Sequence, residues 1–279
     1  MDDLQEWVGR TAESEDDLSL AHARGLVALL DRDPDALVAG YPLPEAWHWI
    51  YFRPVTPQSE VGQDGHAKRG GFLPPIALPR RMWVGGRIRF LGPLILGRPA
   101  RRRSTILAIK TKSGRSGELV FLTVRHEIET AAGPVIDEEQ DLVYKSLPAP
   151  GDAPRAEPAP GDGAWSERVT TDPVTLFRFS ALTFNGHRIH YDQPFATAVE
   201  GYPGLVVHGP LTALLLMDAA KRHREGRSGR PLRFEYRAVS PLFSGEEIEI
   251  AGSAPTGPTR VWAAGPRGLA MTATVEWER

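Results

Sequence analysis

One segment of this 279-residue chain constrains the fold more than any other, the stretch from Pro210 to Arg224. Proline stands where the first helical residue is favoured, basic residues fill the last turn and Gly226 follows, so both ends of a helix are well marked. Apolar side chains occupy nearly every face of its first part. Because such a helix must be covered on all sides, the sequence predicts a sheet that surrounds it.

Segments rich in β-branched and aromatic residues, bounded by Gly or Pro, predict two antiparallel meanders. The first meander is expected at residues 87–92, 104–112, 117–130 and 135–144. The second is expected at residues 232–239, 246–252, 260–264 and 269–277. A short helix is predicted at residues 17–30, where the apolar residues have helical spacing.

The two meanders repeat a pattern, which indicates duplication of one unit. Residues 93–97 and 241–245 share Pro-Leu-x-x-Gly after a strand-like segment, and we match the strands 117–129 and 268–278 to each other. The expected class is α+β with a double hot-dog fold, in which two antiparallel sheets each wrap a central helix. We expect an N-terminal hot-dog domain at 1–147, a Pro/Gly-rich linker at 148–164 and a C-terminal catalytic domain at 165–279.

The N-terminal half is expected to be degenerate and non-catalytic. Where its central helix should begin, the aromatic run from Trp47 to Phe52 is enclosed by prolines. Such a run is typical of a core, but it is also suited to line an acyl pocket that faces the other half.

Composition excludes several classes of function. A formal net charge of -2 provides no field that would gather nucleic acid or an anionic membrane. The absence of cysteine excludes disulfides, thiolate nucleophiles and Cys-ligated metals. No apolar run approaches the roughly 20 residues that span a bilayer, and the acidic start lacks the features of a signal peptide, so a cytoplasmic location is expected.

Polar side chains suited to catalysis are concentrated between Phe184 and Ala196, and between Val206 and Pro210. A loop cluster of histidine and asparagine can exchange protons near neutral pH through its histidines. The N–H groups at the start of the following helix can hold a developing negative charge. These two parts suffice to add or remove water across an activated double bond.

The second half resembles the MaoC-like, R-specific enoyl-CoA hydratases. The family's order of motifs is matched by Asn185, His190, Asp192, the Phe195-Ala196 pair and the His208-Gly209 pair. Segments 70–75, 80–83 and 180–185 resemble the branch that contains mesaconyl-C4-CoA hydratases, itaconyl-CoA hydratases and type 2 hydroxyacyl-thioester dehydratases.

The resemblance implies roles for individual residues, with one departure. Thr183 stands where the family has its catalytic aspartate, and two extra residues separate Asn185 from the matched histidine. His190 is the expected general base, with His187 or Asn185 orienting the water and the Gly209 N–H holding the thioester oxygen. Each side chain also has a purely structural interpretation, and for His208 we favour it. The residues expected to bind substrate are Thr183, Arg188, Val207, His208, Trp47, Arg80 and Arg81.

The resemblance implies a hydro-lyase acting on a short, carboxylated enoyl-CoA such as mesaconyl-C4-CoA or itaconyl-CoA. No cofactor is expected beyond the coenzyme A of the substrate, and the chain is expected to be a monomer or a homodimer. The alternatives are a 3-hydroxyacyl-ACP dehydratase, a thioesterase and a non-catalytic acyl-thioester binding protein.

Two further motifs have weaker interpretations. A zinc site formed by His187, His190, Asp192 and His208 is conceivable, but hydration of a thioester needs no metal. The glycine-rich segment 62–71 lacks the ending of a phosphate-binding P-loop, so we expect a mobile surface loop there.

Overall fold

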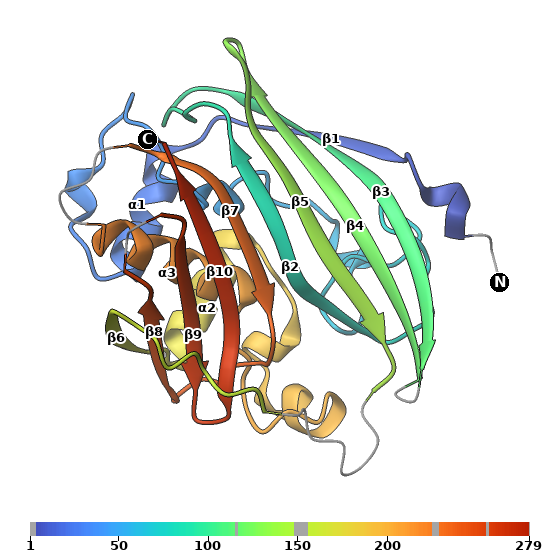
Figure 1. Ribbon diagram of the computed structural model, residues 1–279. Coiled ribbons are helices and arrows are strands. Elements are labelled where there is room, and N and C mark those ends of the chain that lie inside the picture. The colour runs from blue at the N-terminus through green and yellow to red at the C-terminus, as the bar shows by residue number, and fades with distance from the viewer. Residues whose placement is uncertain (1–3, 115–116, 148–155, 225–228, 255–256, 279) are drawn as a thin grey trace.

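The architecture is one curved, fully antiparallel sheet with its helices on one face (Figure 1). A computed structural model describes residues 4–114, 117–147, 156–224, 229–254 and 257–278. The ten strands of the sheet follow the order β1-β3-β4-β5-β2-β7-β10-β9-β8-β6. The order of the first half mirrors that of the second about the β2–β7 pair, as expected for duplicated units.

Each half begins with a strand and a helix and ends with four strands, the first of which pairs with the last. The first half contains β1 (Thr11–Asp16), α1 (Leu20–Leu29), β2 (Arg80–Phe90), β3 (Ala100–Gly114), β4 (Gly117–Thr130) and β5 (Gly133–Lys145). The second contains β6 (Trp165–Thr170), α2 (Pro173–Thr183), α3 (Gly209–Arg222), β7 (Pro231–Ala238), β8 (Glu247–Gly252), β9 (Thr259–Gly265) and β10 (Gly268–Trp277). Short helical turns lie at η1 (Leu4–Trp7), η2 (Pro34–Ala36), η3 (Trp47–Ile50), η4 (Gln58–Glu60), η5 (Arg188–His190) and η6 (Phe195–Val199).

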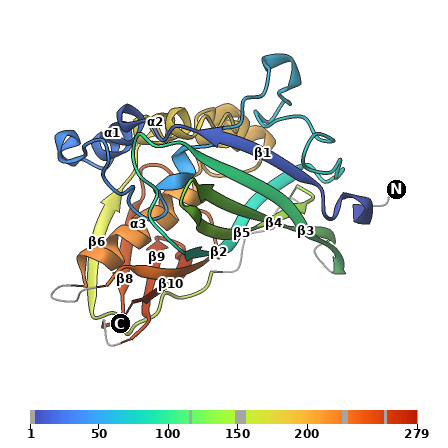
Figure 2. The same ribbon diagram turned by 90° about the horizontal axis from the view of Figure 1, so that it is seen from above.

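Helix α3 is the buried helix that the sequence predicts. Nine of its residues, from Leu211 to Ala220, are buried, and they pack into the largest apolar core with residues of both halves. Seen from above, α1 and α2 lie over α3, which the strands of the second half enclose from the other side (Figure 2). Its buried Asp218 forms an ion pair with Arg32, 2.9 Å away, so α3 is also tied to the first half.

The structure corrects the expected arrangement of the sheet. Two separate sheets were predicted, but β2 and β7 pair from Gly85↔Arg237 to Arg89↔Arg233 and join the halves into one sheet. The strand match across the halves was wrong by one position. Strand β4 (117–130) is the second strand after the first Pro-Leu-x-x-Gly turn, and β9 is the second strand after the other turn. Strand β4 therefore corresponds to β9, and β5 corresponds to β10.

The degenerate core of the first half is confirmed. No long helix stands between α1 and β2 in the described residues, and η3 takes that place. Its His48 side chain is 4% exposed and contacts Glu138 at 2.9 Å. A buried ion pair therefore occupies part of the space that an apolar helix fills in the second half.

Three elements were missed by sequence patterns, namely β1, β6 and α2. Both strands are short and lie at the two edges of the sheet. Residues 148–155 of the predicted linker lie outside the described residues, and 156–164 lead into β6. In the described part of the chain, no helix has the length and apolar character needed to cross a membrane.

Candidate active site

A row of four imidazole rings leads from the N-terminal half to the start of α3. The ring centroids of His66 and His187 lie 4.0 Å apart, those of His187 and His190 5.4 Å, and those of His190 and His208 3.6 Å. Sequence analysis predicted three of these residues and missed His66. We call these four residues the histidine row.

His190 has its tautomer fixed by the backbone. Its Nδ1 lies 2.7 Å from the carbonyl oxygen of Val206, which only accepts hydrogen bonds, so Nδ1 carries the proton and Nε2 keeps its lone pair. Burial lowers the pKa of His190 from 6.5 to about 4, against the opposing effect of the Val206 bond. His190 is therefore a neutral proton acceptor at physiological pH.

His208 and Gly209 place the histidine row against the first turn of α3. His208 is 1% exposed, and its Nε2 shares a 2.9 Å hydrogen bond with the Ser180 hydroxyl. Burial, with the charges of His190 and His187, holds the pKa of His208 well below its usual range. The ring of His190 stacks on that of His208, the residue directly before Gly209. The predicted base, His190, therefore lies beside the predicted oxyanion donor, the Gly209 N–H.

Gly209 also contacts the N-terminal half. A Cβ atom at this position would lie 2.6 Å from the ring of Trp83 on β2, which is closer than any carbon contact allows. The Trp83 ring stacks on Tyr236 of β7 with centroids 4.6 Å apart, so it has little freedom to move. Only glycine therefore fits at the first residue of α3 without displacing Trp83.

The loop 62–66 of the first half is docked onto the histidine loop of the second half. The Arg188 N–H donates to the Asp64 carbonyl at 2.9 Å, and the Arg188 side chain donates to the Gln63 carbonyl at 3.0 Å. Gly65 has a φ of +88°, and a Cβ there would lie 1.7 Å from the Gly186 carbonyl oxygen. The two backbones thus approach as closely as glycine permits, and this loop is not the mobile surface loop that was expected.

Asp64 and His66 form a hydrogen-bonded pair within that loop. One carboxylate oxygen accepts from the His66 backbone N–H at 3.0 Å, and the other contacts His66 Nδ1 at 2.9 Å. Since an ionised carboxylate only accepts, Nδ1 carries the proton and Nε2 of His66 is unprotonated. Nε2 makes no hydrogen bond to any residue in the described ranges.

The charges of this pair follow from burial and from its neighbours. Burial alone would raise the pKa of Asp64, but the hydrogen bonds and charge of His66, with that of His187, hold it well below its usual range. Burial and the charge of Arg81 lower the pKa of His66 to about 4, although Asp64 opposes them. Burial and the charges of His66 and His190 likewise hold the pKa of His187 below its usual range. At neutral pH the cluster is one carboxylate beside neutral imidazoles.

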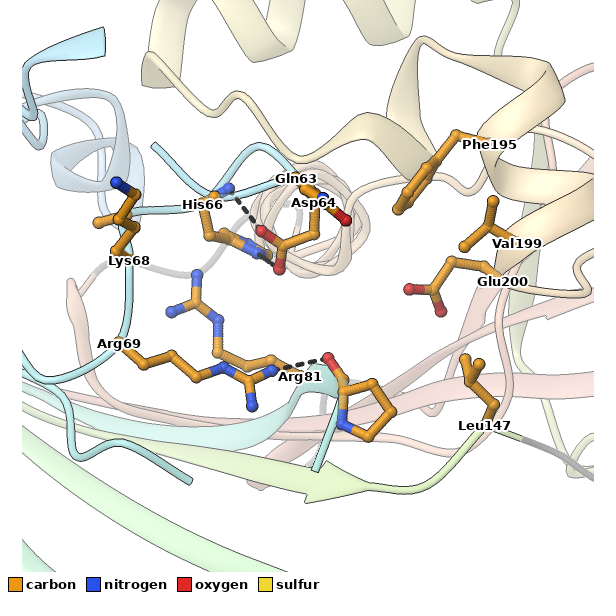
Figure 3. Close-up of a pocket in the computed structure, with 13 residues that line it drawn as sticks. Gln63, Asp64, His66, Lys68, Arg69, Arg81, Leu147, Phe195, Val199 and Glu200 are labelled. Carbon is orange, nitrogen blue, oxygen red and sulfur yellow. Dashed lines mark hydrogen bonds and ion pairs between the residues drawn. The ribbon is translucent and has the colours of Figure 1, made fainter. Parts of the chain in front are cut away.

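A cavity of about 480 Å³ opens beside Asp64 and His66 (Figure 3). Both halves line it, with residues 62–64, 66–69, 79, 81 and 147 from the first and Phe195, Val199 and Glu200 from the second. Figure 3 shows the guanidinium of Arg81 reaching toward His66 inside the cavity. The side chains of Arg81 and Lys68 form neither ion pairs nor hydrogen bonds with other described residues, so two cations are free to meet an anionic ligand.

Several residues predicted to bind substrate already have protein partners. Arg80 is buried and donates to the Glu200 carboxylate at 2.8 Å. Nε and Nη2 of Arg188 both donate to one carboxylate oxygen of Asp192, at 2.9 and 2.7 Å. Trp47 is 2% exposed in the main core and does not line the cavity. The structure therefore gives Arg80, Arg188 and Trp47 structural contacts in place of the predicted ones.

The remaining predicted residues shape the loop. The Thr183 hydroxyl donates to the Phe179 carbonyl at 2.8 Å, so it is bound to its own helix. The Asn185 side chain accepts from the His187 backbone N–H at 3.0 Å and so fixes the turn. Val207 is buried, and its N–H donates to the Leu242 carbonyl at 2.9 Å.

The set of zinc ligands that the sequence made conceivable is not assembled in the described part of the chain, but another set is. Ring nitrogens of His190 and His208 are bonded elsewhere, and Asp192 is paired with Arg188. In its place Asp64, His66 and His187 offer one ligand atom each, all within 4.8 Å of one another. Two imidazoles and a carboxylate are a donor set that binds zinc and similar divalent ions.

Solved structures share this architecture and define the fold. A MaoC-like dehydratase superposes with a TM-score of 0.72 at 15% identity and covers 99% of both chains. A conserved Mycobacterium tuberculosis protein with a double hot-dog fold superposes with a TM-score of 0.64 at 15% identity, covering 97% of this chain and 96% of its own. The fold is the double hot dog of MaoC-like dehydratases.

Sequence relatives give the family. The profile of the type 2 hydroxyacyl-thioester dehydratases matches residues 46–244, and the chain belongs to that family. Mesaconyl-C(4)-CoA hydratase of Chloroflexus aurantiacus is 47% identical over 98% of both chains. The mitochondrial type 2 hydroxyacyl-thioester dehydratase of Schizosaccharomyces pombe is 29% identical over 75% of this chain and 77% of its own. The protein is accordingly an enzyme of the hydratase and dehydratase class.

Proposed function

We propose that the protein adds water to the double bond of a short, carboxylated enoyl-CoA, with mesaconyl-C4-CoA as the foremost substrate. The observation that carries this proposal is a cavity lined by the neutral His66, the first ring of the histidine row, with the unpaired guanidinium of Arg81 within it. The 47% identity to a mesaconyl-C(4)-CoA hydratase over nearly the whole chain supports the choice of acyl group.

The chemistry follows from the two groups beside the start of α3. Nε2 of His190 takes one proton from a water molecule while the water oxygen bonds to the β-carbon. The π electrons of the double bond move toward the thioester oxygen, where the Gly209 N–H holds the negative charge, a contribution of about 3 kcal/mol for one such donor. The His190 imidazolium then returns its proton to the α-carbon, so one water is added and the base is regenerated.

Arg81 is the residue that we propose to bind the free carboxylate of the acyl group. A guanidinium binds a carboxylate through two parallel hydrogen bonds, and it does so best where no protein anion competes. Arg188, which the sequence favoured for this role, is already paired with Asp192. Arg81 has no such partner in the described part of the chain and lies on the lining of the cavity.

Turnover of three thioesters tests the proposed function. The wild-type protein is incubated with mesaconyl-C4-CoA, itaconyl-CoA and crotonyl-CoA, and loss of the enoyl-thioester absorbance is followed. We expect hydration with kcat/KM highest for mesaconyl-C4-CoA and lowest for crotonyl-CoA. Absence of turnover with all three would refute the proposal. Release of free thiol would indicate a thioesterase, and preference for a carrier-bound thioester would indicate an ACP dehydratase.

Replacing Arg81 with methionine is expected to remove the preference for a carboxylated acyl group. Loss of a charge-assisted pair worth about 2 kcal/mol lowers kcat/KM for mesaconyl-C4-CoA roughly thirtyfold, whereas crotonyl-CoA, which has no free carboxylate, changes little. Lys68→Met is the matched control, since it removes the other unpaired cation of the cavity. An equal loss with both substrates in Arg81→Met would show that Arg81 binds coenzyme A or shapes the cavity instead.

The proposed site lies within a single chain, so either a monomer or a homodimer is compatible with it. Light scattering distinguishes the two. A cytoplasmic location stays a prediction that cell fractionation tests. No cofactor takes part in the proposed steps.

A further inference from the structure

Addition of water to a double bond requires that the water be aimed as well as deprotonated. A water molecule that donates both of its hydrogens to fixed acceptors has a lone pair directed away from them, toward the β-carbon. His190 provides one acceptor. The resemblance places the second on an aspartate, but Thr183 stands there and its hydroxyl donates to a helix carbonyl.

A carboxylate and an imidazole of the other half of the chain lie against the loop that carries His190. Asp64 and His66 lie on the loop 62–66, which is bonded through its backbone to Arg188, two residues before His190. His66 packs on His187 at 4.0 Å, and His187 packs on His190 at 5.4 Å. Asp64 and His66 both line the cavity.

The pair has the chemistry of an acceptor. Both oxygens of Asp64 are committed to His66, one to its backbone N–H and one to Nδ1. That second bond keeps the proton on Nδ1 and leaves the lone pair of Nε2 without a partner among the described residues. Burial lowers the pKa of His66 and of His190 to about 4, so both rings are neutral at pH 7.

We propose that the Asp64–His66 pair of the N-terminal half replaces the missing aspartate of the family. Nε2 of His66 accepts a hydrogen bond from the water that His190 deprotonates, and Asp64 holds the His66 tautomer in which Nε2 can accept. His66 is thereby a catalytic residue and Asp64 a positioning residue. No proton is transferred at His66, so the balance of the hydration steps is unchanged. The inference rests on the proposed hydratase function.

Asp64→Asn tests the pair with little change of shape. The asparagine oxygen can still accept from the His66 backbone N–H, but the amide N–H₂ now faces Nδ1 and forces the proton onto Nε2, which then cannot accept. We expect kcat for mesaconyl-C4-CoA to fall about a hundredfold with KM within about twofold. In protein labelled with ¹⁵N-histidine, the ring shifts of His66 should change from the Nδ1–H to the Nε2–H tautomer.

A double-mutant cycle separates positioning from general damage. His66→Phe keeps the ring contact with His187 and removes the acceptor, so its kcat should fall at least as far as that of Asp64→Asn. Since Asp64 acts through His66, the double variant should be no slower than His66→Phe alone. Glu60→Gln, on the same segment but outside the cavity lining, is the matched control and should retain wild-type kcat.

Three results would overturn the inference. The first is wild-type kcat in Asp64→Asn despite the changed tautomer. The second is additive losses in the double variant. The third is loss of wild-type activity on dialysis against a chelator with recovery on adding Zn²⁺, which would assign Asp64, His66 and His187 to a metal. A wild-type protein that hydrates none of the three thioesters refutes the proposed function itself, and is distinguishable from all three.

Discussion

Replacing His190 with glutamine is expected to lower kcat for mesaconyl-C4-CoA about a thousandfold, the middle of the range for loss of a general base. Glutamine can still donate to the Val206 carbonyl, so the contact that holds the side chain is preserved. Its amide cannot take a proton from water at any accessible pH. Stopped-flow or steady-state loss of the enoyl absorbance gives kcat, and KM should stay within a few-fold, since the base is needed only in the transition state.

His126 offers a matched control for the His190 variant. Its imidazole is also buried, with a pKa lowered by burial to about 4, and it shares a 2.8 Å hydrogen bond with Ser104 on the strands of the first half. His126→Gln therefore measures what disturbing a buried histidine does to folding and activity. We expect near wild-type kcat in His126→Gln and a similar unfolding midpoint for both variants. Retention of more than a tenth of the activity in His190→Gln would move the role of base elsewhere in the histidine row.

Local patterns predicted the interior of the fold and failed at its margins. Helix α3 was predictable because apolar residues on all sides leave a helix one possible environment, and the meander strands because β-branched and aromatic residues recur along them between Gly or Pro. Strands β1 and β6 pair on one side only and alternate exposed with half-buried residues, so their sequences carry many charges. Helix α2 had a usable signal that was overlooked, since Asp172 accepts from the Thr175 N–H at 2.7 Å ahead of Pro173.

The joining of the two halves lay beyond sequence patterns. Whether β2 pairs with β7 or remains an edge depends on the packing of two units, and each strand looks the same in either case. The same limit hid half of the proposed site. Asp64 and His66 sit more than a hundred residues before His190, in a glycine-rich loop whose composition is that of a surface turn. A histidine two residues after an aspartate in such a loop is the signal that could have drawn attention to it.

Arginine contacts show a related limit. Side-chain type predicted that Arg80, Arg81 and Arg188 could bind an anion, and all three lie near the cavity or its loops. Partners inside the protein decide which are free, and these depend on the tertiary fold. Arg80 forms an ion pair with Glu200 and Arg188 forms one with Asp192, whereas Arg81 has no carboxylate partner in the described residues.

The buried neutral histidines also make the fold sensitive to acid. Burial lowers the pKa from 6.5 to about 4 for His66, His126 and His190. Between pH 4 and pH 6.5 these imidazoles are protonated in the unfolded chain but neutral in the folded chain. The free energy of unfolding therefore rises with pH in this window and falls as the solution is acidified. Burial raises the pKa of Glu138, but His48, His126 and Gln140 together lower it to about 2, so Glu138 titrates below this window and does not offset the effect.

We expect each of these three histidines to lower the free energy of unfolding by about 2 kcal/mol between pH 8 and pH 5, and His187 and His208, whose pKa values burial also lowers, to add to this loss. This loss is comparable with the whole stability of many domains, so unfolding near pH 5 is the expected visible result. Denaturant titrations at pH 8, 7, 6 and 5 measure it, and His126→Gln should reduce the difference by about 2 kcal/mol because one such group is removed. A free energy of unfolding that is constant from pH 8 to pH 5 would mean that these rings accept protons in the folded state, and it would equally undermine the assignment of His190 and His66 as neutral acceptors.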